Sequence, residues 1–298
     1  MLVDLPLPGV RDRLLLLRSL ETFAGLDEEA ITLLAEHSKP RVFRAGEAVF
    51  VEGRPVESVH VVVDGQISSR RRGKLLAEVR RARGVGFLSL LARDEGGVDA
   101  VADLPSHTLE VSAAIVVDAM EENFSFLRNL LRLTGRGLIE RRSGLPADPD
   151  TTPPAEIGVY PTRKHTLVER VLDLRSGGIF ATGNLEPVVE LARRNEEVEF
   201  APGEVLWRAG ERSTWSIRTI AGLVHCVSAG GREVTVGKGF VLGSLDALGE
   251  LPRSFEARAA TRVVAYRSGL EDMLSIMESH PSLGRELLAV LARVLLTS

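Results

Sequence analysis

An ungapped internal repeat constrains this 298-residue chain more than any other feature. Residues of the first half recur 157 positions later, so that Phe23 matches Phe180 and Gly46 matches Gly203. Because only glycine takes a positive φ freely, glycines that coincide at one offset mark turns with the same backbone. A repeat of this length predicts a duplicated domain rather than a solenoid unit. Further matching pairs are Gly53 with Gly210, Gly65 with Gly222, Gly86 with Gly243 and Arg128 with Arg285.

Composition and charge limit the class of protein. The hydrophobic content of 44% and charged content of 26% are typical of a soluble globular protein. A net charge of −4 gives no overall basic field for nucleic acid or a membrane surface. The single cysteine, Cys226, excludes a disulfide within the chain, and its apolar surroundings predict a strand residue. The first residues lack a basic start before an apolar core, so we expect a cytoplasmic protein without a membrane span.

The order of predicted elements repeats along the chain. Residues 11–20 predict a short amphipathic helix, and Asp27 is a candidate N-cap for the next one. Between Val42 and Val117, short apolar runs alternate with glycine turns, and the run 109–117 is predicted as the last strand. A helical period returns from Phe124. Many short strands at this spacing favour a sandwich or barrel.

Residues 143–165 interrupt this pattern with five prolines and several small polar residues. Such a composition predicts an extended, semi-rigid linker. The order of helix, strands and helix then begins again. We therefore expect one domain at residues 11–142, the linker at 143–165 and a second domain at 166–298.

Two motifs carry a resemblance to a known family. A pattern F-x-x-G-E followed by a large apolar pair and a glycine occurs at Phe43–Gly53 and, with the apolar pair shifted, at Phe200–Gly210. The stretch 239–261 holds a glycine turn, a short apolar helix and then Pro-Arg-Ser. The chain thus resembles the cyclic nucleotide-binding domain family. This resemblance implies a mainly β fold with flanking helices, in which two eight-stranded jelly-roll barrels stand in tandem.

The second copy keeps half of the family's phosphate-binding cassette. In the family, an arginine pairs with the cyclic phosphate and a glutamate binds the ribose 2′-hydroxyl. Arg253 stands at the arginine position, whereas Ser244 replaces the glutamate. Arg253 could alternatively be a surface arginine that pairs with Glu250 or Glu256. The candidate nucleotide-binding residues are Leu242, Gly243, Ser244, Leu245, Arg253 and Ser254.

The first copy departs further from the cassette pattern. Gly86, Phe87 and Leu88 align with its start, so that Phe87 replaces the glutamate. Gly96 stands in the place of the arginine, and three carboxylates surround it in the sequence. Carboxylates repel an anionic phosphate, so this degenerate cassette predicts no ordinary nucleotide binding. The carboxylates are those of Asp94, Glu95 and Asp99.

Other chemistry finds little support in the sequence. None of the six histidines forms the His-x-His pattern by which cupins, a related barrel family, hold a metal. His60 and His225 lie in strand-like runs and are predicted to be packed strand residues. No Ser-His-Asp signature, P-loop or Rossmann fingerprint occurs. We therefore expect no enzyme and no metal site.

Two surfaces could carry an output. A basic cluster on one predicted hairpin is either a solvated hairpin or a docking patch for an acidic partner or anionic ligand. The apolar stripe of residues 281–296 fits a helix that packs on its own barrel or forms a homodimer, and both options stay open. No helix-turn-helix follows, so we expect no direct DNA binding. The basic cluster comprises Arg70, Arg71, Arg72, Arg80 and Arg81.

These observations favour a non-enzymatic regulatory or scaffold protein that signals through partner proteins. The alternative is a sensor that binds a cyclic nucleotide or cyclic dinucleotide in the second domain through Arg253. An enzyme or a metal-binding cupin is a more remote third option.

Overall fold

The computed structural model describes residues 9–181 and 183–297. By contacts, the chain divides into two compact units, and each is considered by itself. The first unit extends to Leu130 and includes Leu288–Ser298, whereas the second comprises Leu131–Leu287. Both divisions fall inside helices, namely α5 (Phe124–Arg141) and α10 (Pro281–Thr297). The domain boundaries expected from the repeat stay a prediction.

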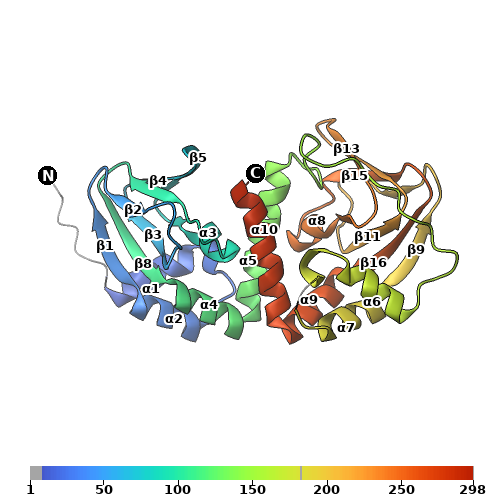
Figure 1. The fold of residues 1–298 in the computed structure, drawn as a ribbon. Helices are drawn as coiled ribbons and strands as arrows, with labels where there is room; N and C mark the ends of the chain where they lie inside the picture. The colour runs from blue at the N-terminus through green and yellow to red at the C-terminus, as the bar shows by residue number, and fades with distance from the viewer. Residues whose placement is uncertain (1–8, 182, 298) are drawn as a thin grey trace. The chain divides into compact units, whose positions relative to one another are not determined.

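Two four-stranded antiparallel sheets form the first barrel, which lies in the first unit (Figure 1). Their strand orders are β1-β8-β3-β6 and β2-β7-β4-β5. Each sheet joins strands from both ends of the repeat, as a jelly roll requires. The strands are β1 (Lys39–Phe43), β2 (Ala48–Phe50), β3 (Ser58–Asp64), β4 (Gln66–Arg71), β5 (Lys74–Arg80), β6 (Gly84–Val85), β7 (Asp99–Ala102) and β8 (Ser106–Ser112).

The second barrel repeats this topology strand for strand. Its sheets have the orders β9-β16-β11-β14 and β10-β15-β12-β13. The predicted fold, mainly β with flanking helices and two eight-stranded jelly-roll barrels, is confirmed. The strands are β9 (Glu196–Phe200), β10 (Val205–Trp207), β11 (Trp215–Ala221), β12 (Val224–Ser228), β13 (Glu233–Val236), β14 (Val241–Leu242), β15 (Phe255–Ala259) and β16 (Val263–Gly269).

Helices flank each barrel at corresponding places (Figure 1). As predicted, the Asp27 side chain caps α2, because it accepts a hydrogen bond from the Ala30 amide at 2.8 Å. No helix in the described ranges is both long and apolar enough to cross a membrane. The helices, besides α5 and α10, are α1 (Val10–Ser19), η1 (Glu21–Phe23), α2 (Glu28–His37), α3 (Phe87–Ala92), α4 (Ala113–Glu122), α6 (Leu167–Arg175), η2 (Gly178–Phe180), α7 (Glu186–Arg194), α8 (Ser244–Leu248) and α9 (Leu270–Ser279).

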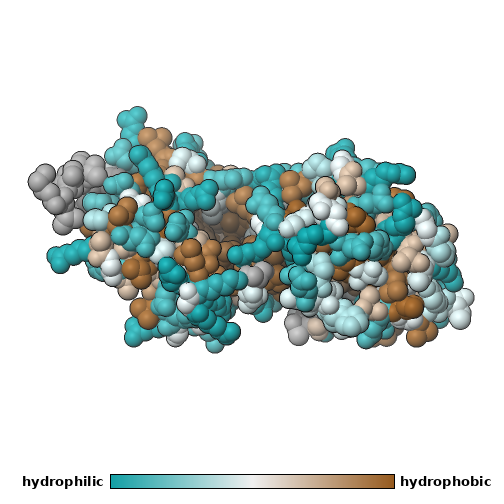
Figure 2. Space-filling view, turned by 90° about the horizontal axis from the view of Figure 1, so that it is seen from above, coloured by the Kyte–Doolittle hydropathy of each residue, from teal (hydrophilic) through white to brown (hydrophobic). Residues whose placement is uncertain are grey.

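Each barrel has its own apolar core. In the first barrel, aliphatic residues of β3, β4, β6 and β7 pack with the partly buried Phe43 and Phe50. In the second barrel, Trp207 and Phe255 join the aliphatic core residues. Figure 2 shows that polar residues predominate on the visible face, with hydrophobic residues scattered among them. The hydrophobic residues that alternate along the strands therefore face the inside of each barrel, as the sequence pattern predicts.

The last strand of the first copy is shorter than predicted. The apolar run 109–117 was expected to be one strand, but β8 ends at Ser112 and α4 begins at Ala113. A continuous apolar run has no period that distinguishes a strand from a buried helix. In α4, Val116, Ala119 and Met120 are buried at helical spacing, so tertiary packing decides the conformation.

Two glycines of the second barrel differ in why a side chain is disfavoured there. Both have a positive φ, but only one of them also lies close to another part of the backbone. Gly222 has φ +101°, and an added Cβ would lie 2.1 Å from the Arg262 carbonyl oxygen. Gly231 has φ +77°, but an added Cβ would meet nothing within 4 Å. We expect Gly231→Ala to lower the free energy of unfolding by about 1–2 kcal/mol. Gly222→Ala should lower it by at least about 3 kcal/mol, because backbone must also shift.

Urea denaturation followed by tryptophan fluorescence measures this difference, since both tryptophans, Trp207 and Trp215, lie in the second barrel. Equal losses for the two glycine variants would contradict the close approach at Gly222.

Candidate functional site

The cassette of the second barrel begins at a left-handed glycine. Gly243 has φ +78° and precedes α8, the short helix predicted from the sequence. A Cβ added there would lie 2.1 Å from Nη1 of Arg253 and 3.4 Å from the Trp207 ring. Glycine is therefore required both for the turn and for the space that the guanidinium group occupies.

Arg253 turns into the barrel instead of toward solvent. Its side chain is among the largest fully buried in the chain, with 2% of the residue exposed. Nη1 donates a hydrogen bond to the Gly243 carbonyl at 3.1 Å, and Nη2 donates to the Trp215 carbonyl at 2.6 Å. The guanidinium carbon lies 4.2 Å from the ring centre of Trp207 and 4.8 Å from that of Trp215. These contacts stabilise the buried charge by hydrogen bonding and by cation–π attraction.

The alternative of a surface arginine is therefore wrong. Glu256, one of its two suggested partners, instead pairs with Arg258 at 2.9 Å. The spacing of a cassette arginine does not fix the direction of its side chain, which depends on the rings beneath it.

Burial also sets the ionisation of the cassette. It lowers the pKa of Arg253 to about 10, an effect opposed by the carboxylates of Asp246 and Glu211. The group therefore remains protonated at neutral pH. Burial raises the pKa of Asp246, whose Oδ1 accepts a hydrogen bond from Ser254 Oγ at 2.7 Å. Among the buried polar atoms of the described residues that have no hydrogen-bond partner are Arg253 Nε, Trp207 Nε1 and Asp246 Oδ2.

Part of the expected linker enters the second barrel. Leu145 is fully buried and belongs to its apolar core. The preceding Gly144 has φ +82°, and an added Cβ would lie 3.1 Å from the Ser254 carbonyl oxygen and 3.8 Å from Ser228 Cβ. We call residues 143–150 the strap. The strap thus covers the cassette at Ser254, the residue next to Arg253.

Polar contacts hold the strap in place. Arg142 donates through Nη1 to the Pro146 carbonyl at 2.6 Å. Burial lowers the pKa of Arg142, and the nearby Asp148 opposes this shift. Arg232, in the turn between β12 and β13, lies 3.5 Å from Asp148 and 3.6 Å from Asp150. These two pairs are partly exposed and contribute little individually, so the burial of Leu145 dominates.

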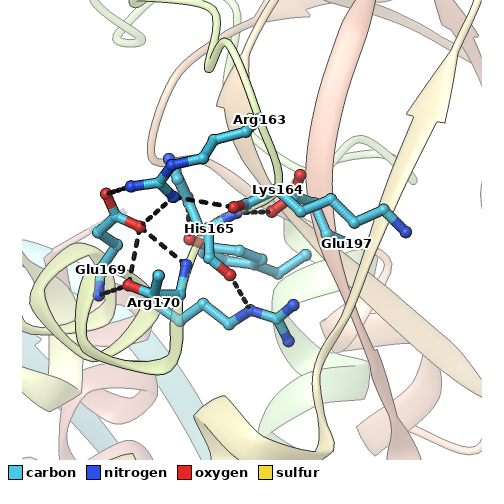
Figure 3. A network of polar contacts seen from close by, with 8 residues as sticks. Arg163, Lys164, His165, Glu169, Arg170 and Glu197 are labelled. Carbon is cyan, nitrogen blue, oxygen red and sulfur yellow. Dashed lines mark hydrogen bonds and ion pairs between the residues drawn. The ribbon is translucent and has the colours of Figure 1, made fainter.

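A second polar network fixes the other end of residues 143–165 (Figure 3). The His165 amide donates to Glu197 Oε2 in β9 at 2.9 Å. Arg163 forms two hydrogen bonds with Glu169 in α6, at 2.8 and 2.9 Å. Arg170 Nε donates to the His165 carbonyl at 3.2 Å. The segment is therefore anchored to the second unit at both ends.

The first barrel holds a different arrangement at its cassette. Gly86 has φ +94° and precedes α3, and the buried Phe87 packs edge-on against Phe23 with ring centres 5.5 Å apart. Arg71 pairs with Asp94 at 3.0 Å. A Cβ added at Gly96 would lie 3.6 Å from Arg71 Nη2. A guanidinium group from the hairpin thus neutralises one carboxylate that the sequence places in the cassette.

The remaining predicted residues occupy the following places. Within the basic cluster, Arg71 is half-buried by its pairing. The other four arginines are exposed, on β4, in the turn between β4 and β5, on β5 and in the turn after β5. In the described ranges, no group of three or more His, Cys, Asp or Glu residues could hold a metal ion. Sequence analysis missed the strap and the two tryptophans around Arg253. Leu145 between a glycine and a proline was the available signal.

Three packed strand residues confirm their predictions. His60 is 4% exposed, and its Nδ1 lies 3.0 Å from Thr108 Oγ1. Burial lowers the pKa of His60 to about 4. His225 lies in β12, with Nε2 3.2 Å from a Glu233 carboxylate oxygen. Cys226 is buried in the same strand, and burial raises the pKa of its thiol.

The second barrel also matches a family model. Residues 197–280 match the model described as the cyclic nucleotide-binding domain. The matched residues run from β9 through α9 and include the cassette with Arg253. This part of the chain is therefore similar to a cyclic nucleotide-binding domain. No curated protein matches the chain.

Solved structures of similar fold include regulatory and transcriptional proteins. The regulatory domain of Toxoplasma gondii PKA with cAMP is 15% identical over 99% of this chain and 100% of its own, with a TM-score of 0.39. The regulatory subunit of a cAMP-independent protein kinase A from Trypanosoma brucei is 17% identical over 96% and 90%, with a TM-score of 0.37.

The N-terminal domain of a transcriptional regulator from Streptomyces coelicolor A3(2) is 28% identical over 42% of this chain and 94% of its own, with a TM-score of 0.38. Because these TM-scores are low, the assignment of the second barrel rests on the family model and on its own strands.

Truncation of Leu145 should destabilise the second barrel. Leu145→Ala removes a fully buried side chain, so we expect the free energy of unfolding to fall by about 2–5 kcal/mol. Val159→Ala is the control, because Val159 is 85% exposed in the same segment and should change stability by less than about 0.5 kcal/mol. Urea denaturation followed by tryptophan fluorescence measures the free energy of unfolding of both variants. Similar stability for both variants would show that the strap is not part of the barrel.

His60 should make the first barrel sensitive to acid. Its pKa is about 4 in the folded state and about 6.5 when unfolded, so the unfolded state binds more protons between these values. Stability is therefore full above pH 6.5 and falls by up to about 3 kcal/mol as the pH drops to 4. His60→Ile, which introduces the residue of the matching position Ile217, should remove this dependence, whereas His37→Gln should retain it.

Circular dichroism during urea denaturation at pH 4 to 7 measures the slope of stability against pH. An unchanged slope in His60→Ile would contradict the assignment.

Proposed function

We propose that the protein is a non-enzymatic regulatory or scaffold protein with tandem cyclic nucleotide-binding-like domains. Its second barrel is closed by the chain's own strap and works without a cyclic nucleotide. It signals through partner proteins. The observation that carries this proposal is the position of the Arg253 guanidinium group inside the barrel.

The geometry of Arg253 supports a structural role. A phosphate ligand would need N–H donors of the guanidinium group. Nη1 and Nη2 each already donate one hydrogen bond to a backbone carbonyl group. Both indole rings would also have to move for the side chain to turn outward. The strap adds a further barrier, because Leu145 would leave the core when the cassette opens. Exposure of a leucine side chain alone opposes such opening by about 1.5–3 kcal/mol.

The cassette of the first barrel supports the same reading. Gly96 provides no side chain for a phosphate, and Arg71 is engaged by Asp94. Phe87 is buried against Phe23 and offers no polar atom to a ribose. The first cassette therefore contributes packing rather than nucleotide recognition.

The surface offers one charged region for a partner. Four of the five arginines of the basic cluster are exposed on the hairpin of β4 and β5, whereas Arg71 is not. Such a cluster attracts an acidic protein surface. Leu288, Leu291 and Leu295 of α10 are buried, which favours packing of this helix within the chain over a homodimer. The four arginines are Arg70, Arg72, Arg80 and Arg81.

A sensor remains the second candidate, because one observation favours it. Arg253 Nε, Trp207 Nε1 and Asp246 Oδ2 are buried without a hydrogen-bond partner, and such groups can signal a site that reorganises for a ligand. In this version, a cyclic nucleotide would displace the strap and turn Arg253 outward. Its affinity would be reduced by the free energy of that displacement.

Calorimetric titration of the whole protein distinguishes the two candidates. With cyclic AMP, cyclic GMP and cyclic di-GMP at concentrations up to about 1 mM, we expect no heat of binding, because the cassette is closed. Arg253→Ala should instead lower the free energy of unfolding of the second barrel by about 2–4 kcal/mol, since it leaves a cavity between two rings. Micromolar binding that Arg253→Ala abolishes would establish the sensor and overturn the proposal.

A further inference from the structure

The first barrel contains an open cavity. The cavity has a volume of about 590 Å³ and is lined by residues of β1, β2, β3, β8 and the loop between β2 and β3. None of Gly86, Phe87 and Leu88 lines it, although a Cβ added at Gly86 would lie 2.9 Å from the ring of Phe50, a lining residue.

Part of the cavity wall is aromatic. The rings of Phe43 and Phe50 meet the imidazole of His60 edge-on, with centres 5.5 and 5.4 Å apart. His60 is buried, and its Nδ1 is bonded to Thr108. Charged residues also line the cavity, and two of them, Arg41 and Glu110, pair at 2.6 Å. The other charged lining residues are Glu47, Arg54 and Glu57.

The second barrel shows what fills the same place. At the repeat offset, Ser58 matches Trp215, and each residue begins its strand opposite a matching partner, Ser112 or Gly269. The indole of Trp215 packs edge-on against Trp207, with ring centres 5.1 Å apart. Trp207 in turn matches Phe50, which lines the cavity.

Two guanidinium groups enclose that indole in the second barrel. Arg253 and Arg267 lie 4.8 and 4.5 Å from the ring centre of Trp215. Their counterparts in the first barrel are Gly96 and Glu110. The first barrel thus lacks the indole, and Ser58, which stands in its place, lines the cavity together with Phe43 and Phe50.

We propose that this cavity binds a small aromatic heterocycle about the size of an indole. The ring lies against Phe50 and Phe43, where it gains edge-to-face contacts as Trp215 does on Trp207. The hydroxyl of Ser58, 3.4 Å from His60 Nε2, lies at the cavity and can accept a hydrogen bond from a ring N–H. This site is independent of the proposed closure of the second barrel.

Calorimetric titration of the whole protein with indole tests the proposal. The wild-type protein should bind with a dissociation constant on the order of 0.1–1 mM, as suits a ligand of this size. Ser58→Trp supplies the ring from the chain itself and should weaken binding at least about tenfold. Ser58→Thr keeps the hydroxyl and most of the space, and should bind within about threefold of the wild type.

A further variant guards against misfolding of Ser58→Trp. Phe50→Leu keeps an apolar side chain but removes the aromatic edge, and should weaken indole binding by about threefold to tenfold. Circular dichroism confirms that each variant is folded. Absence of indole binding by the wild type, or equal binding by the wild type and both folded variants, would overturn the proposal.

Discussion

The burial of one positive charge, that of Arg253, determines the structure of the second barrel. A buried guanidinium group is stable only when its hydrogen-bond donors and its charge are compensated. Two carbonyl groups accept hydrogen bonds from Nη1 and Nη2, and the faces of Trp207 and Trp215 offset the charge, while Nε has no hydrogen-bond partner. Gly243 must lack a side chain to leave room. A residue that aligns with a ligand-binding arginine thereby becomes a core residue, and the strap covers the cassette beside it.

The two barrels show how few side chains separate a filled barrel from a hollow one. Their strands pair in the same order. The indole of Trp215 and the guanidinium group of Arg253 fill the second barrel, whereas Ser58 and Gly96 stand at these positions in the first. The side chains at the strand ends of a jelly roll therefore determine whether it contains a cavity, while the backbone hydrogen bonds maintain the fold.

Much of the fold could be predicted from the sequence, because turns depend on local chemistry. Glycines that recur at one offset located the turns of both barrels, and Asp27 located a helix start. The direction of Arg253 could not be predicted, since the same spacing suits a ligand, the surface or the core. Leu145 was hidden in a proline-rich segment whose composition indicates a linker. In both cases packing between residues distant in sequence decides the outcome, and periodicity does not report it.

Cross-linking of the strap to β12 tests the central claim, that the chain closes its own cassette. A Cβ at position 144 would lie 3.8 Å from Ser228 Cβ, the usual separation in a disulfide. In a Cys226→Ala background, Gly144→Cys with Ser228→Cys should cross-link rapidly on oxidation, at the same rate with and without saturating cyclic AMP. Val159→Cys with Ser228→Cys is the control pair. Failure of the first pair to cross-link, or its suppression by cyclic AMP, would contradict a closed, ligand-independent barrel.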